Sequence, residues 1–374
     1  MFKKILLAAI CAVVSLGADA QDICTINGSV AGGGVKNVVL TRTDSFGNEV
    51  NVATAKVKRG KYSFKVKLAK DEPVMLYNIT GLGEGSVELF VEPGVVTVST
   101  SGVSAVEQSR VTGTPTNDTY AAYKAIYTNG EERIKANTPA NATAAEIKRI
   151  EAKENILTRA QAIRFLIENN ASPVMPLEVE RTLLSQLSEA YADQMTKAVS
   201  SSLHSHPYYL SLRNKVLANN LKVGNEVPDI ALPLFDGTMK NLKDYRGRYV
   251  VLNFWANGCS KSDSMLAELQ SLYDILKGDS EFVIVSFALE NSIDIWKESV
   301  AGKNINREGW VNACDGAGAA STAAKYFGVE KAPKIILIEP EGRAVTLDMD
   351  IDELIMRVEQ IHSGDLYYLD DVKE

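Results

Sequence analysis

One cysteine in this chain stands where a thiol can act as a nucleophile. Cys259 follows the apolar run from Tyr249 to Trp255, which is typical of a buried strand, and precedes a stretch whose apolar residues recur at helical spacing. A thiolate at the start of a helix is stabilised by unpaired backbone N–H groups and by the helix dipole. Lys261, close behind, adds a positive charge. The spacing predicts a thiol of low pKa; the alternative is a remnant thiol without turnover.

The remaining cysteines are Cys11, Cys24 and Cys314. Cys314 precedes a helical stretch that leads to Pro333, so it is a candidate for resolving a disulfide on Cys259 from a distance. The alternative is a small buried cysteine. A structural zinc site needs short-spaced ligand pairs, and no C-x-x-C or H-x-x-x-H pair occurs. The sequence therefore indicates no metal centre and no cofactor.

Two histidines, His204 and His206, stand beside Pro207 in a helical stretch. A pair of this kind is more often solvated surface than a metal site, so we expect both side chains in solvent.

The charge balance argues against a nucleic-acid partner. The net charge is -7 and the isoelectric point about 5.3, and no long block of lysine or arginine occurs. Hydrophobic residues make up 45% of the chain and charged residues 23%, which is the composition of a folded globular protein. At about 100–200 residues per domain, 374 residues predict two or three domains.

The first twenty residues have the pattern of a secretory signal peptide. Lys3 and Lys4 precede an apolar run from Ile5 to Gly17, and Ala18-Asp19-Ala20 forms a small-x-small cleavage site. The run is shorter than the ~20 residues that span a bilayer, and no later segment approaches that length. We therefore expect cleavage after Ala20 and a soluble periplasmic product without stable membrane insertion.

A lipid anchor is not expected, because a lipid-attachment site needs a small residue before the cysteine. Cys11 and Cys24 both follow isoleucine instead. Removal of the signal peptide leaves an odd number of thiols, so at least one stays free or pairs between chains.

Three segments with different patterns follow the signal peptide. Residues 21–115 contain short runs rich in β-branched and aromatic residues between glycine-rich turns, which predicts an all-β sandwich or small barrel. Residues 116–221 have helical periodicity, and the apolar residues Ile150, Ile156, Ala160, Ile163 and Ile167 are predicted to form a core or helix-pairing face. Residues 222–374 alternate strand and helix patterns, which predicts an α/β domain. Its expected elements include strands at Tyr249–Trp255, Phe282–Ala288 and Ile335–Ile338, another strand near Val345, and helices at Ala319–Phe327 and Ile351–Ile361.

The last segment resembles the periplasmic thioredoxin-like thiol-disulfide oxidoreductases of the TlpA/ResA type, which have an AhpC/TSA-type redoxin domain. The resemblance covers about Lys222 to His362 and rests on the runs Gly224–Ile230, Leu234–Thr238, Leu242–Gly247, Val250–Ala256, Tyr326–Val329, Ala332-Pro333 and Ile338–Gly342. It implies a thioredoxin-like fold in this segment. The β-rich segment looks like the N-terminal extension that many such secreted proteins carry.

The resemblance also implies a W-x-x-x-C-x-x-C site, from which this chain departs. Trp255 and Cys259 occupy the tryptophan and first cysteine positions, whereas Ser262 replaces the second cysteine. Met265 and Ala267 occupy positions where the family usually has glutamate and proline, and Gly258 stands where tryptophan is frequent. A serine hydroxyl cannot complete thiol exchange.

Pro333 matches the proline that the family holds opposite the thiol. The resemblance therefore implies a cis bond between Ala332 and Pro333, with the Ala332 backbone facing Cys259.

Two functions follow as expectations. The first is thiol-disulfide exchange through the single thiol of Cys259, with Ser262 and Pro333 in the site and Trp255 and Lys261 supporting it. Its partner would be a protein or a small thiol or disulfide. The second is a redox-inactive binding or scaffold module of the cell envelope. The sequence leaves the substrate, the reductant and the oligomeric state open.

Overall fold

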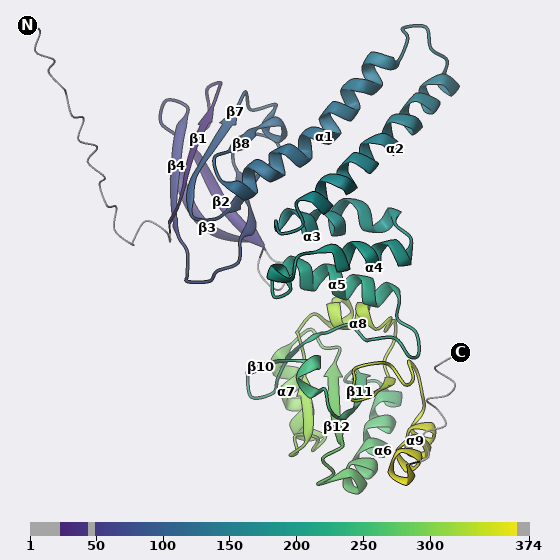
Figure 1. Cartoon of the computed structure of the whole chain (residues 1–374). Coiled ribbons are helices and arrows are strands. Elements are labelled where there is room, and N and C mark those ends of the chain that lie inside the picture. Colours follow the sequence, from purple (N-terminus) through teal and green to yellow (C-terminus); the bar gives the residue numbers. More distant parts are fainter. Residues whose placement is uncertain (1–22, 44–48, 365–374) are drawn as a thin grey trace, which may run out of the picture. The chain divides into compact units, whose positions relative to one another are not determined.

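The computed structural model describes residues 23–43 and 49–364 (Figure 1). The predicted signal peptide lies outside these ranges. The chain divides into two compact units. One consists of Met1–Leu183 with Lys197–Tyr209, and the other of Leu184–Thr196 with Leu210–Glu374. The helices of the middle segment are therefore shared between the two units.

The first unit contains a β-sandwich of two four-stranded sheets, in the orders β4-β1-β7-β8 and β3-β2-β5-β6. The strands are β1 (Ile23–Val30), β2 (Asn37–Thr43), β3 (Glu49–Lys56), β4 (Lys61–Lys67), β5 (Met75–Thr80), β6 (Val87–Val91), β7 (Gly94–Thr100) and β8 (Arg110–Thr112). Side chains alternate along them: Tyr62 and Phe64 of β4 are buried, whereas Lys61, Ser63 and Lys65 are exposed. No barrel closes among the described strands, so the sandwich is the correct alternative.

Helices follow the sandwich in the chain. They are α1 (Pro115–Asn137), α2 (Ala144–Glu168), α3 (Val174–Glu178), α4 (Glu189–Ala198) and α5 (Pro207–Asn219), with a π-helical turn at Val179–Leu183. Helix α2 begins at a capping box, in which Thr143 and Glu146 satisfy each other's backbone N–H groups. Helices α1 and α2 form an antiparallel hairpin that Figure 1 shows projecting from the sandwich.

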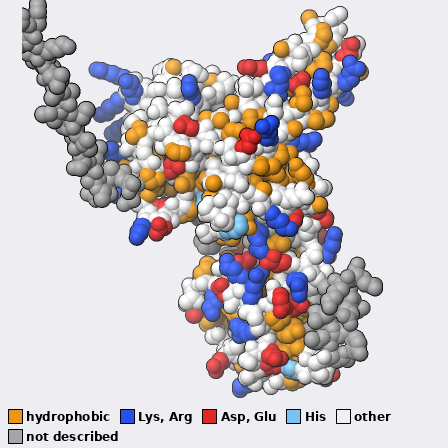
Figure 2. Space-filling model, in the orientation of Figure 1, with side chains coloured by type: hydrophobic (Ala, Val, Ile, Leu, Met, Phe, Trp, Pro, Cys, Tyr) orange, Lys and Arg blue, Asp and Glu red, His pale blue; other side chains and the backbone are white. Residues whose placement is uncertain are grey.

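The prediction for the apolar face of α2 was only partly correct, because Ile150 and Ile163 are half-buried but Ala160 is exposed. Ile156 is 59% exposed and Ile167 is 43% exposed, and the buried face carries Glu154, Thr158, Ala162 and Leu166 instead. Arg133 of α1 explains the difference, because its guanidinium donates to Glu154 at 2.9 Å and to Thr158 at 2.9 Å. Hydrogen bonds between these buried polar side chains thus join the two helices of the hairpin. Figure 2 shows hydrophobic side chains on the outer surface of the hairpin.

The second unit is built on a four-stranded sheet in the order β13-β12-β11-β14. Its elements are β9 (Ala231–Pro233), β10 (Met239–Asn241), β11 (Tyr249–Trp255), α6 (Ser260–Leu276), β12 (Phe282–Ala288), α7 (Ile293–Gly302), β13 (Trp310–Ala313), α8 (Thr322–Tyr326), β14 (Lys334–Ile338) and α9 (Ile351–Ser363). Strands β11, β12 and β13 are parallel, and β14 pairs antiparallel with β11. This is the predicted α/β domain.

Two expected elements differ in detail. The helix predicted at 319–327 is shorter, because a 3-10 turn at Gly318–Ala320 precedes α8 and Ser321 caps the helix with its side chain. No regular strand forms near Val345; its N–H donates to Leu337 at 2.8 Å, and only isolated bridges join this segment to β14.

In the described part of the chain, no helix combines the length and the hydropathy that crossing a membrane requires.

Candidate thiol site

Cys259 is the N-cap residue of α6, where the chain leaves β11 and turns into the helix. Gly258 makes this turn with a φ of 73°, in the left-handed region that favours glycine. The Asp263 N–H donates to the Cys259 carbonyl at 2.9 Å, which begins the helix. Cys259 forms no side-chain cap hydrogen bond, but its position at the N-cap puts the thiol beside the unpaired N–H groups of the first turn.

These donors lower the pKa of the Cys259 thiol below its ordinary value. The Ser262 N–H is the main cause, followed by the Ser262 hydroxyl, and the Lys261 N–H contributes as well. Partial burial and the charge of Asp263 act in the opposite direction. We expected the ammonium charge of Lys261 to stabilise the thiolate; its backbone N–H does so instead.

Ser262 occupies the second position of the C-x-x-S segment and is fully buried. Its Oγ accepts the N–H of Ala256 at 3.2 Å, while its hydroxyl is a donor toward Cys259. The side chain therefore joins the end of β11 to the thiol. A hydroxyl in this place stabilises a thiolate but has no sulfur with which to close a disulfide.

The peptide bond between Ala332 and Pro333 is cis, as expected from the resemblance. The Ala332 carbonyl faces the thiol, and the Cys259 S–H donates to it over 3.8 Å. The backbone beside Pro333 and the sulfur of Cys259 thus lie within contact of each other.

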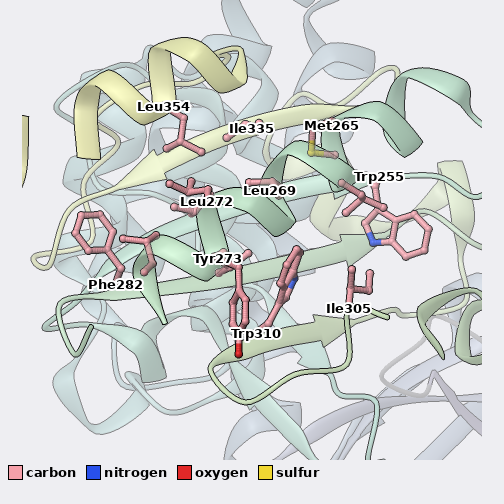
Figure 3. Packing of buried hydrophobic residues seen from close by; sticks show 14 of the residues in the cluster. Trp255, Met265, Leu269, Leu272, Tyr273, Phe282, Ile305, Trp310, Ile335 and Leu354 are labelled. Atoms are coloured by element: carbon pink, nitrogen blue, oxygen red, sulfur yellow. The ribbon is translucent and has the colours of Figure 1, made fainter. Parts of the chain in front are cut away.

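Trp255 lies under the site rather than on its surface. Its side chain is fully buried, and its indole N–H has no hydrogen-bond partner within the described residues. Figure 3 shows Trp255 beside Met265 at one end of the hydrophobic cluster that α6 packs onto the sheet. Lys303 lies 5.9 Å from the ring centroid and pairs with Asp263 at 2.5 Å, which partly compensates the carboxylate nearest the thiol.

A buried polar chain crosses the sheet beneath α6. The Trp310 indole donates to Ser286 at 2.8 Å, Ser286 donates to Asn253 at 2.5 Å, and the Asn253 amide donates to the sulfur of Met265 at 3.5 Å. Met265 stands where the family usually has glutamate. The Met265 thioether, unlike a glutamate carboxylate, cannot act as a base for a thiol at the position of Ser262.

Cys314 is fully buried at the end of β13. Burial raises the pKa of its thiol, and the nearby charges of Asp315 and Glu290 act in the same direction. Its sulfur accepts the Gly316 N–H at 3.4 Å and donates to the Glu290 carbonyl at 3.7 Å. Cys24, Cys259 and Cys314 are all free thiols in the structure.

Glu290 belongs to the site although the sequence did not point to it. Its carboxylate accepts the N–H of Asn257 at 2.9 Å and so holds the turn that precedes Cys259. Its carbonyl contacts Cys314. No local motif marks this residue, because its partners are distant in sequence.

A cavity of about 500 Å³ lies between α6, β14 and the start of α9. Ser260 and Pro333, next to the thiol, line it, whereas Cys259 itself does not. Its apolar lining includes Met265, Pro333, Ile335, Met349 and Ile351. Lys261, Lys334, Glu268, Asp350 and Asp352 add charges of both signs. A cavity of this size can hold a side chain or a small molecule.

The two histidines near Pro207 do not behave alike. His206 is buried, which contradicts the expectation of a solvated side chain, and its ring nitrogen bonds to the Val74 carbonyl at 3.1 Å. Burial lowers its pKa. His204 stacks on Tyr209 at 4.4 Å. Among the described residues, no cluster of three or more histidine, cysteine or acidic side chains could hold a metal ion.

Comparison with known proteins assigns the two ends of the chain to families. Residues 223–344 match the AhpC/TSA family. The C-terminal domain is an AhpC/TSA-type, thioredoxin-like domain. Residues 24–120 match a domain of unknown function, DUF4369, which fits the separate N-terminal extension.

The relatives of the AhpC/TSA-type domain are thiol-disulfide oxidoreductases. The thiol-disulfide oxidoreductase ResA of Bacillus thuringiensis subsp. konkukian is 23% identical over 125 residues, which is 33% of this chain and 68% of the relative. A thiol-disulfide oxidoreductase structure from Bacteroides fragilis is 25% identical with a TM-score of 0.34, covering 37% of this chain and 99% of that one. A thioredoxin domain from Bacteroides vulgatus is 26% identical with a TM-score of 0.35, covering 38% of this chain and 98% of that one.

Proposed function

We propose that this protein performs thiol-disulfide exchange through the single thiol of Cys259, with Ser262 in place of a resolving cysteine. The observation that carries the proposal is the position of Cys259 at the N-cap of α6, with its sulfur 3.8 Å from the Ala332 carbonyl. The Ser262 N–H and hydroxyl lower the pKa of this thiol. A thiolate is the reactive form in exchange, so a lowered pKa raises the fraction able to attack at neutral pH.

The exchange needs two external sulfur compounds. The Cys259 thiolate attacks a substrate disulfide R–S–S–R′, forms Cys259–S–S–R and expels R′–S⁻, which takes a proton from water. Ser262 cannot displace R. A second thiol, R″–SH, therefore attacks as its thiolate, forms R–S–S–R″ and returns the Cys259 thiolate.

The other site residues have supporting roles in this proposal. The Ala332 carbonyl and Pro333 provide the backbone against which a substrate chain lies beside Cys259. Trp255 supports the turn from below, and Lys261 contributes its N–H to the thiolate. Cys314 is the one other thiol in this unit, and its burial argues that it reaches Cys259 only if its loop opens.

Oxidised glutathione is a direct probe of this chemistry. Incubation at neutral pH should add one glutathione to Cys259, detected as a mass increase that a reducing thiol reverses. Cys259→Ser should abolish the adduct, and Cys314→Ala is the matched control that should keep it. An unmodified wild-type protein under these conditions contradicts the proposal.

A second candidate is a binding module that uses the same groove without redox turnover. The cavity of about 500 Å³ with its apolar lining beside Pro333 favours it. Alkylation of Cys259 at neutral pH separates the two functions, since an inert thiol leaves only the binding module.

We also propose that the protein is exported and works in the periplasm. The support is the basic, apolar and small-residue pattern of residues 1–20. N-terminal sequencing of the protein from a periplasmic fraction should begin at Gln21. A start at Cys11 or Cys24 with added acyl mass contradicts the soluble form.

A further inference from the structure

The charge of Asp263, which acts against the Cys259 thiolate, is paired with a lysine from the end of another helix. Asp263 lies in the first turn of α6, where its N–H donates to the Cys259 carbonyl at 2.9 Å. Its carboxylate accepts the Lys303 ammonium at 2.5 Å, across a sequence separation of 40 residues. The fold therefore places a cation on a carboxylate that disfavours the thiolate.

Lys303 is held in place through its backbone and its side chain. It is the C-cap residue of α7, and its N–H donates to the Ser299 carbonyl at 2.9 Å. Its own carbonyl accepts the Gln270 amide of α6 at 3.0 Å. The side chain is 23% exposed, and the ammonium lies 5.9 Å from the centroid of the Trp255 ring. An ion pair with one partner fixed in this way loses less side-chain entropy than a pair of two mobile surface chains.

Charged residues on the other elements around the thiol are Lys261 on α6, Glu290 after β12, and Glu330, Lys331 and Lys334 around Pro333. The Glu290 carboxylate accepts the Asn257 N–H at 2.9 Å, and the Lys334 ammonium donates to the Phe327 carbonyl at 3.1 Å. Lys261, Glu330 and Lys331 are exposed. None of these residues belongs to the ion pair, so substitutions within the pair leave this background of charge unchanged.

Two opposing effects set the charge on the thiol. The Ser262 N–H and hydroxyl lower the pKa of the Cys259 thiol, whereas the charge of Asp263 raises it. A cation in contact with a carboxylate weakens the field of that carboxylate at a third group, because the two opposite charges largely cancel there. The contact also fixes the direction in which the carboxylate points. The ion pair with Lys303 therefore protects the thiolate from Asp263.

From these contacts we propose that Lys303 is a positioning residue for Cys259, which holds the Asp263 carboxylate and neutralises its charge so that the thiol stays reactive in exchange. This role rests on the thiol-disulfide exchange proposed above. Lys303 makes no contact with the substrate in this scheme, and its ammonium acts on the thiol through Asp263. A neutral side chain in place of Lys303 should therefore leave the Asp263 charge free to disfavour the thiolate.

Alkylation of Cys259 by iodoacetamide, followed against pH in the full-length protein with Cys24 and Cys314 replaced by alanine, tests the proposal without requiring exchange. Lys303→Met should raise the midpoint by about 0.3–0.5 pH units, because it uncovers one negative charge in the first turn of the helix. Below the midpoint, alkylation and exchange with oxidised glutathione should both slow by about two- to threefold. Lys303→Arg, which keeps the charge, should retain the wild-type midpoint.

Arg307→Gln is the matched control. Arg307 pairs with Asp274 of α6 at 3.6 Å and lies 5.3 Å from the centroid of the Tyr273 ring, and its side chain is also 23% exposed. Asp274 lies about three turns further along α6 than Asp263, so breaking this pair should leave the midpoint of Cys259 unchanged.

Two further measurements separate an electrostatic role from a structural one. In an Asp263→Asn background, Lys303→Met should have no effect, and high salt should reduce its effect in the wild-type background. Lys303→Gln is the second variant if Lys303→Met does not fold. The proposal is overturned if the midpoint does not rise, if it rises equally in the Asp263→Asn background, or if Arg307→Gln raises it as much. A protein with the Lys303-dependent midpoint that forms no glutathione adduct contradicts the proposed exchange and leaves the electrostatic role of Lys303 standing.

Discussion

At the scale of single residues, Ser262 acts on the thiol of Cys259 through both its backbone N–H and its hydroxyl. Ser262 accepts the Ala256 N–H with its oxygen and directs its own proton toward Cys259. In the proposed exchange, the same residue stands in place of a resolving thiol and stabilises the thiolate of Cys259. A site of this kind favours forming a mixed disulfide over completing an internal one.

Ser262→Ala should raise the pKa of Cys259, because it removes the hydroxyl donor and leaves the backbone N–H groups in place. The measurement is the pH dependence of alkylation, with Cys24 and Cys314 replaced by alanine. In wild type the midpoint should lie below that of a free cysteine, which is about 8.5. Equal midpoints in wild type and variant would show that the hydroxyl does not act on the thiolate.

Ser262→Cys should raise the rate of insulin reduction by about tenfold or more, because a second sulfur allows the mixed disulfide to be resolved internally. The gain should stay partial. The position is fully buried, which disfavours a second thiolate, and Met265 offers no proton acceptor. Ser262→Ala serves as the control without gain. If Ser262→Cys folds normally and its activity is unchanged, the missing second thiol is not what limits insulin reduction.

At the scale of elements, polar contacts decide how the α1–α2 hairpin packs. Arg133 bridges Glu154 and Thr158 across the two helices, and Asn137 also donates to Glu154 at 3.2 Å. Gly130 allows this close approach. A Cβ at that position would lie 2.4 Å from Thr158 Oγ1, which Arg133 holds in place.

Gly130→Ala should therefore destabilise the β-rich and helical unit by roughly 1–3 kcal/mol, as overpacking does, despite the better helix propensity of alanine. Gly302→Ala is the matched control, since Gly302 ends α7 with open space around its missing Cβ. Urea unfolding followed by circular dichroism measures both. If Gly130→Ala is as stable as the wild type or more stable, α1 and α2 can move apart to admit the methyl group without loss of stability.

At the scale of the whole molecule, the stabilities of the two compact units should depend differently on pH. All three tryptophans, Trp255, Trp296 and Trp310, belong to the unit with the thiol. The other unit contains Glu178, whose carboxyl is buried and whose pKa burial raises to about 7. Tryptophan fluorescence and circular dichroism therefore separate the two units in one protein.

The stability of the unit with Glu178 should fall as pH rises from about 4.5 to about 7. The carboxyl keeps its proton to higher pH in the folded chain than in the unfolded chain, so folding is favoured below this window and penalised above it. Glu88, whose pKa is lowered, acts in the opposite direction at lower pH.

Glu178→Gln should flatten this pH dependence, because the amide is neutral throughout. Urea unfolding at several pH values between 5 and 8, followed by circular dichroism, checks it. The transition seen by tryptophan fluorescence should be the same in both proteins. A pH dependence that survives the substitution would assign the effect to another group.

The sequence by itself determined the elements whose signals are local. The apolar runs of β11 and β12 and the buried face of α6 agree with the structure, because strand and helix periodicity is contained within a few consecutive residues. The thiol at the start of α6 was predictable for the same reason. The cis bond before Pro333 followed from the family resemblance rather than from any periodicity.

Only the tertiary structure decided what depends on residues far apart in the chain. Ile156 and Ile167 of α2 are exposed because Arg133 of α1 binds Glu154 on the buried face. His206 is buried, and its ring bonds to the Val74 carbonyl. The burial of Cys314 and the hydrogen bond from the Asn257 N–H to Glu290, before Cys259, arise in the same way. Side-chain hydrogen bonds and close packing between distant segments leave no periodic pattern, so these features emerge only when the chain is folded.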